Sequence, residues 1–83
     1  ELSAPLLIDL LALDDAGFRQ LFAGSPIKRI GRDRMVRNCL IAAGNSGSAE
    51  LVGAVLLHLN DSNPVVRGAA VWALATLDPA RFD

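Results

Sequence analysis

The chain has 83 residues, a net charge of −1 and a hydrophobic content of 52%. This composition is typical of a small globular domain and excludes an intrinsically disordered chain. The near-neutral balance excludes a general electrostatic attraction to nucleic acid or membrane, so any such attraction must be local, within a Debye length of about 8–10 Å.

The single cysteine, Cys39, limits the chemistry of the chain. One cysteine forms no internal disulfide and cannot by itself hold zinc or an iron–sulfur cluster. We expect a small buried hydrophobe in a reducing compartment, which favours a cytoplasmic protein. Because the chain begins at Glu1 rather than Met, we also expect it to be a piece of a longer protein.

The first part of the chain predicts short helices. Apolar periodicity predicts a helix over Pro5–Leu13, which is interrupted by Asp9 and far too short for the ~20 residues of a membrane span. Asp14 or Asp15 is placed to cap a second helix that carries apolar residues. A break at 24–26 then precedes a single helical turn expected over 27–30, because Ser25 is placed as N-cap and Pro26 suits a first helical position.

Longer helices follow. The pattern predicts a helix over Arg32–Ala43 that stops at Gly44-Asn45, where glycine suits a left-handed C-cap. Ser48 is placed to cap a helix over Ala49–Leu59. Asn63 as N-cap and Pro64 as first residue predict a last helix to Leu77, before Asp78-Pro79. The expected inward stripe of the middle helix is Val52, Val55, Leu56 and Leu59.

An internal repeat connects two of these helices. The segment RMVRNCLIAAGN at 34–45 aligns with NPVVRGAAVWALA at 63–75 through two Val-Arg pairs that lie thirty residues apart. Repetition at this period favours stacked antiparallel helical hairpins. The last helix is apolar on nearly every side, which predicts cover from two directions and a core position for Trp72.

The segment DSNPVVRGAAVWALATL resembles the second helix of HEAT-like repeats. With FRQLFAGSPIKRIGRDRMVRNCLIAAGNSG before it, the chain resembles the C-terminal region of epoxyqueuosine reductases over residues 18–77. The resemblance implies one all-α HEAT-like domain of about five helices over 1–83. Two residues depart from the pattern, Ala43 where leucine is usual and Ala69 where histidine is frequent.

The same resemblance implies a function. Family enzymes complete queuosine synthesis in tRNA with an upstream domain that holds a cobalamin and two [4Fe–4S] clusters. The cysteine runs for those clusters are missing from this chain. We therefore expect no catalytic residues, metal or cofactor here, and a fragment that is not an enzyme by itself. The expected partners are the tRNA anticodon arm and the catalytic domain of the parent oxidoreductase.

A basic segment carries the expected contacts. Between Ser25 and Asn38, five cations stand against one acid, Asp33. Arginine and lysine clusters bind phosphates and position a nucleic acid without reading its sequence. The candidate nucleic-acid-binding residues are Lys28, Arg29, Arg32, Arg34, Arg37 and Asn38.

Plainer interpretations compete at several of these positions. Lys28, Arg29 and Arg32 can be a solvated turn, and Asn38 can bond a neighbouring loop. Arg37 and its repeat equivalent Arg67 can pair with Asp33 or Asp61. His58 has no second ligand at metal spacing.

A second function also remains open. The first helix is richer in leucine than one buried stripe requires. Such a surface favours a protein-interaction scaffold that docks on a catalytic domain or associates with a second copy.

Overall fold

Helices account for nearly all regular structure in the computed structural model, which describes residues 3–21, 23 and 31–82. No strand occurs in these ranges, so the predicted all-α class with about five helices is confirmed. The candidates Lys28 and Arg29 and the turn expected over 27–30 lie outside the described residues. The elements are α1 (Ala4–Leu11), α2 (Asp15–Leu21), α3 (Arg32–Ser46), η2 (Ala49–Leu51), α4 (Val52–Leu56), α5 (Pro64–Leu77) and η3 (Pro79–Phe82).

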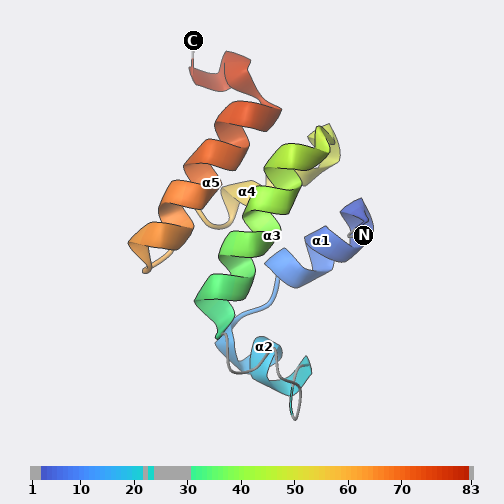
Figure 1. The fold of residues 1–83 in the computed structure, drawn as a ribbon, viewed down its shortest axis with the longest axis vertical. Helices are drawn as coiled ribbons and strands as arrows, with labels where there is room; N and C mark the ends of the chain where they lie inside the picture. Colours follow the sequence, from blue (N-terminus) through green and yellow to red (C-terminus); the bar gives the residue numbers. More distant parts are fainter. Residues whose placement is uncertain (1–2, 22, 24–30, 83) are drawn as a thin grey trace.

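The two long helices, α3 and α5, lie side by side and run in the same direction (Figure 1). The short α4 lies behind them, α1 crosses beside α3, and α2 lies near the beginning of α3 (Figure 1). Between them is a hydrophobic cluster to which α1, α3, η2, α4 and α5 all contribute. Its larger members include Leu7, Leu11, Val36, Leu40, Leu51, Val55, Val66 and Leu74.

Side chains cap three of the helices, two of them at the predicted positions Asp14 and Asn63, whereas the predicted cap Ser48 makes no side-chain cap bond. Asp14 Oδ1 accepts a hydrogen bond from Gly17 N–H at 2.7 Å and so caps α2. Ser3 Oγ accepts from Leu6 N–H at 3.3 Å at the start of α1. Asn63 Oδ1 accepts from Val65 N–H at 2.8 Å, and α5 has the predicted bounds. Each cap satisfies a backbone donor that has no partner inside its own helix.

The predicted end of α3 at Gly44 is wrong. The helix continues to Ser46, and Gly47 is its C-cap with φ +70°, in the left-handed region that glycine adopts readily. Gly44 is instead a buried helical residue. A Cβ added there would come within 2.5 Å of Trp72 Cζ3, so Gly44 lets the indole of α5 approach the backbone of α3.

The middle helix is shorter than predicted. A 3₁₀ turn over Ala49–Leu51 replaces its first turn, and α4 ends at Leu56. The tighter turn changes the angular register of the residues that follow. The buried set is therefore Leu51, Ala54, Val55 and His58, whereas Leu56, predicted to point inward, is 37% exposed.

The last helix contacts both α3 and α4, but its outer side is uncovered. Val66, Ala70, Ala73 and Leu74 are buried against the rest of the molecule. On the outer side of α5, Trp72 is 43% exposed, so its predicted core position is wrong. The physical reason is that α3 and α4 pack on only part of the circumference of α5, whereas the apolar pattern of the helix extends further.

The internal repeat of the sequence corresponds to a shared pattern of buried side chains in α3 and α5. Positions that lie thirty residues apart in the alignment are buried in both helices. The matched pairs include Val36 with Val66, Leu40 with Ala70, and Ala43 with Ala73. Since each pair faces the same cluster, α3 and α5 present equivalent faces to the core.

Candidate nucleic-acid interface

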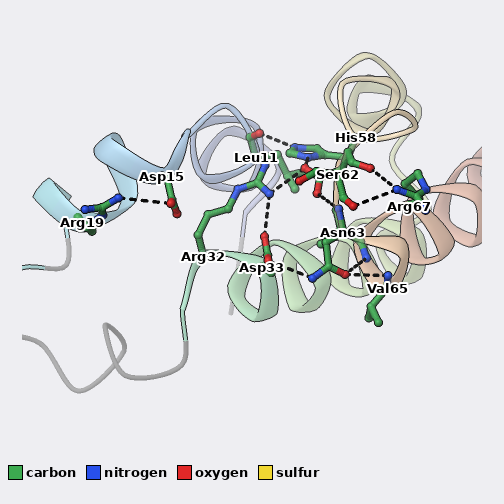
Figure 2. A network of polar contacts seen from close by, with 12 residues as sticks. Leu11, Asp15, Arg19, Arg32, Asp33, His58, Ser62, Asn63, Val65 and Arg67 are labelled. Atoms are coloured by element: carbon green, nitrogen blue, oxygen red, sulfur yellow. Dashed lines mark hydrogen bonds and ion pairs between the residues drawn. The ribbon is translucent and has the colours of Figure 1, made fainter.

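A buried carboxylate, Asp61, organises the turn between α4 and α5. Its Oδ1 lies 2.7 Å from Arg32 Nη1 in an ion pair, and its Oδ2 accepts a hydrogen bond from Asn63 N–H at 3.0 Å. The Asp61 side chain is 8% exposed and that of Arg32 is 18% exposed. Figure 2 shows the surrounding network, which joins α1, α3, the turn and α5.

The charge states in this network follow from its contacts. Burial of the Asp61 carboxyl favours the neutral form, but the hydrogen bond from Asn63 N–H and the ion pair with Arg32 outweigh burial and lower its pKa. Burial likewise opposes the charge of Arg32, and the bonds to Asp61 and Asp33 outweigh it, so the pKa of Arg32 is raised. Both groups are therefore charged at neutral pH.

His58 ties the same turn to α1. Its Nε2 lies 2.6 Å from the carbonyl oxygen of Leu11, and its buried Nδ1 lies 3.8 Å from Asp61 Oδ1. No cluster of His, Cys, Asp or Glu able to hold a metal ion occurs among the residues that the structure describes. In this structure His58 is a buried residue that bonds to the Leu11 carbonyl oxygen.

The repeat positions Asp33 and Asn63 bond to each other. Asn63 Nδ2 donates to Asp33 Oδ2 at 3.0 Å, so the N-cap residue of α5 also contacts the first turn of α3. Arg67 donates through Nη1 to the carbonyl oxygens of Asp61 at 2.7 Å and Ser62 at 3.1 Å. The structural role predicted for Arg67 is confirmed, with backbone carbonyls rather than a carboxylate as acceptors.

The candidate basic residues on α3 have different surroundings. Arg32 is held by two carboxylates, Asp61 at 2.7 Å and Asp33 at 3.0 Å. Arg34 and Arg37 are exposed and take part in no ion pair with a described residue. The pairing of Arg37 with Asp33 or Asp61 therefore does not occur, and Arg37 Nη1 instead donates to Asn38 Oδ1 at 3.3 Å.

A groove runs along the outer side of α3 and α5, with a volume of about 400 Å³. We call it the α3/α5 groove. Its side chains are mainly apolar, with one arginine and one amide from α3. The lining residues are Arg37, Ile41 and Asn45 of α3, and Pro64, Val65, Gly68, Ala69 and Trp72 of α5. Asn45, where the sequence predicts the end of the helix, lies inside α3 and lines this groove.

A second, more polar pocket adjoins this groove. It has a volume of about 370 Å³ and shares Arg37 and Val65 with the groove. Its other lining residues are Asp33, Arg34 and Asn63. The two exposed arginines of α3 thus lie at the end of the α3/α5 groove, an arrangement that sequence analysis does not predict. The spacing of Arg37, Ile41 and Asn45, each four residues apart, was an available signal for one helix face.

Cys39 is a buried thiol, 1% exposed, as expected for a small hydrophobe. Its Sγ lies 3.8 Å from Met35 Sδ, and burial raises the pKa of the thiol. A neutral thiol of this kind is a poor nucleophile. Within the described ranges, no helix has the length and apolar character needed to cross a membrane.

Comparison with curated proteins finds relatives that share one name. The chain is 37% identical over 76 residues to an epoxyqueuosine reductase of Xanthomonas campestris pv. campestris, covering 90% of this chain and 21% of the relative. It is 39% identical over 77 residues to one of Alicycliphilus denitrificans, covering 83% and 21%. It is 32% identical over 83 residues to one of Bacillus subtilis, covering 96% and 21%.

The chain therefore spans about a fifth of the length of these relatives. No protein-family model matches it, and no solved structure matches it.

Proposed function

This chain is related to a small region of the epoxyqueuosine reductases, and from that premise we propose that it is an accessory tRNA-binding domain of such an enzyme. In this proposal, residues 1–83 are one HEAT-like repeat domain whose hairpins contain α3 and α5. The basic segment contacts the backbone of the anticodon arm. The parent protein is a cytoplasmic oxidoreductase, and this part of it positions the substrate rather than reacting with it.

The observation that carries the proposal is the exposure of Arg34 and Arg37 on one stretch of α3 without carboxylate partners in the described structure. A guanidinium that is not paired with a carboxylate is available for bidentate contact with a phosphate. Lys28 and Arg29 are close to them in the sequence and add to the local charge. Arg32 has a different part in the proposal, because its two carboxylates compete with phosphate and fix the start of α3.

The cofactors of the parent enzyme lie elsewhere in this proposal. The expected set is a cobalamin and two [4Fe–4S] clusters, and each such cluster takes about four cysteine ligands. The chain has one cysteine, and it is buried in the core. These residues do not fit a cluster, so no step of the reaction is assigned to this chain.

The proposal is tested by charge reversal with a matched control. The double variant Lys28→Glu/Arg34→Glu and the control Arg19→Glu/Arg81→Glu change the net charge equally. Arg19 and Arg81 form ion pairs with Asp15 and Asp78 and lie outside the basic segment in the sequence. Arg32 is left intact, because reversing it would break the ion pair with Asp61.

The measurement is the affinity for a tRNA anticodon-arm hairpin, by fluorescence anisotropy at low salt. We expect the first variant to lose about tenfold or more and the control to change far less, since phosphate contacts are local. Equal affinities of the two variants would show that the segment does not contact the tRNA.

Exposed apolar residues away from the groove favour a second candidate function, that of a protein-interaction scaffold. Leu6 on α1 is 42% exposed, and Leu57 after α4 is 65% exposed. Such residues can dock on the parent's catalytic domain or on a second copy of the chain. Sedimentation of the chain discriminates between the functions: a dimer whose mass is independent of salt supports the scaffold, and a monomer that binds RNA only at low salt supports the tRNA-binding domain.

A further inference from the structure

The indole of Trp72 is held in place while remaining open to solvent. It packs on the backbone of α3 at Gly44, where an added Cβ would lie 2.5 Å from Cζ3 and 3.0 Å from Cη2. The ring is nevertheless part of a residue that is 43% exposed. One part of the aromatic surface is therefore fixed by packing, and another part is available to a ligand.

The groove beside Trp72 has the dimensions and lining of a small-ligand site. Its volume of about 400 Å³ lies within the ~300–1,000 Å³ typical of such sites. Ile41 and Ala69 line it with apolar atoms, and Asn45 adds an amide that both donates and accepts hydrogen bonds. The groove is open on its outer side, since Val65 is 58% exposed.

Positive charge lies at one end of the apolar groove. Arg37 lines both the groove and the adjoining polar pocket, which Arg34 and one acid, Asp33, also line, so the cations outnumber the acid there. Neither arginine has an ion-pair partner in the described part of the chain. A complementary ligand thus has a flat apolar part for Trp72 and an anionic part for the arginines.

We propose that the α3/α5 groove binds one unstacked nucleotide of a single-stranded RNA segment. The base stacks on the exposed part of Trp72, the adjacent phosphate contacts Arg37, and the Asn45 amide bonds to the base edge. This inference rests on the proposed tRNA-binding function and assigns one nucleotide to a defined place. RNA is commonly bound in this way, with bases stacked on aromatic side chains and phosphates held by arginine.

The charge and the open outer side favour a nucleotide over a peptide. An aliphatic peptide anchor gains most of its binding energy by enclosure, which an open groove does not provide. A base needs only one planar surface, because every base has a π-face. The two arginines also match the regular phosphates of a nucleic acid strand better than a single phosphorylated side chain.

The fluorescence of Trp72 provides a direct test, because it is the only tryptophan and the chain has no tyrosine. The wild-type chain is titrated with a short oligouridylate and, as a control, with an abasic oligonucleotide of the same phosphate count. We expect the base-containing strand to quench the emission and the abasic strand to bind without quenching. Equal effects of the two strands would overturn the inference.

Variants test the same contact by anisotropy of a labelled oligouridylate. We expect Trp72→Ala to weaken binding by about 5- to 140-fold, the range for loss of one stacked base, and Trp72→Phe to retain part of the affinity. The control Val71→Ala removes an apolar side chain of similar exposure, 47%, that does not line the groove. Circular dichroism confirms that each variant is folded.

The outcomes separate this inference from the proposed function. RNA binding that is lost in Lys28→Glu/Arg34→Glu but unchanged in Trp72→Ala overturns the base-stacking site and leaves the tRNA-binding domain intact. If both variants keep the RNA affinity of the wild type, the base-stacking site and the tRNA-binding function are both overturned. Quenching by a phosphorylated peptide, or emission that depends on protein concentration alone, shows a peptide or a second copy in the groove and also overturns the inference.

Discussion

Arg32 at the start of α3 and Asp61 before α5 form an ion pair of 2.7 Å between two elements that are distant in the sequence. The Asp61 side chain is 8% exposed, so its charge depends on this partner and on Asn63 N–H rather than on water. The same turn bonds to α1 through His58 and Leu11 at 2.6 Å. The pair therefore connects the first turn of α3 to the segment that begins α5.

Replacement of Asp61 by alanine is expected to destabilise the fold by roughly 3 kcal/mol. The change leaves the partly buried Arg32 without its main partner and removes the acceptor for Asn63 N–H. Urea unfolding followed by circular dichroism measures the difference, with the slope of the transition as a check on two-state behaviour. In the control Asp15→Ala, the lost ion pair with Arg19 is exposed, with side chains 70% and 66% accessible, and we expect a change below about 1 kcal/mol. Equal destabilisation by both variants would contradict the role given to Asp61.

The lowered pKa of Asp61 also predicts a pH dependence of stability. In the unfolded chain, an aspartate titrates near pH ~3.9, and in the folded chain Asp61 holds its charge to lower pH. Its contribution to the free energy of unfolding is therefore complete above about pH 4–5 and is lost as the pH falls through the folded-state pKa. Unfolding free energies measured from neutral to acid pH should fall more steeply for the wild type than for Asp61→Asn. Parallel curves for the two chains would refute this account.

Local sequence signals were sufficient for the parts of the fold that local chemistry determines. The helix α5 begins after Asn63 and ends before Asp78-Pro79, as predicted, because a side-chain cap and a fixed proline φ act within a few residues. The choice between Gly44 and Gly47 as the end of α3 could not be made in this way. Both glycines permit a left-handed turn, and the contact of Gly44 with Trp72 on another helix is what keeps it helical.

In the candidate site, too, the sequence predicts local features but not the contacts between distant elements. The sequence indicates the local concentration of arginines, but it does not show which of them already has a partner. Arg32 and Asp61 are brought together by the packing of α3 against the turn, and no periodicity encodes that contact. The exposure of Trp72 was also missed, because an apolar helix pattern cannot show on which sides neighbours are present.

Substitution of Gly44 by alanine tests the packing that holds Trp72. The new Cβ would lie 2.5 Å from the indole, so the ring or the helices must move. Overpacking typically lowers the free energy of unfolding by ~1–3 kcal/mol, and the higher helix propensity of alanine offsets about 1 kcal/mol of this loss. We expect a net loss of about 1 kcal/mol together with a changed emission spectrum of Trp72. Gly53→Ala is the control, since nothing lies within 4 Å of its added Cβ, and it should be neutral or stabilising with an unchanged spectrum. A stable Gly44→Ala chain with the wild-type spectrum would contradict the close approach of α3 and the indole.

The salt dependence of RNA binding distinguishes the arginines of α3 from one another. Each phosphate contact contributes a slope of about 0.7–0.9 to the fall of log K with log salt. Because Arg34 and Arg37 are exposed and free of described ion pairs, Arg34→Gln and Arg37→Gln should each reduce the slope by about that amount. Arg81→Gln, which removes an equal charge from an exposed pair with Asp78, should leave the slope unchanged. The measurement is a titration of the anticodon-arm hairpin at several salt concentrations for all three variants. If the slope is the same in all of them, these arginines do not contact phosphates, and the affinity must come from other parts of the chain.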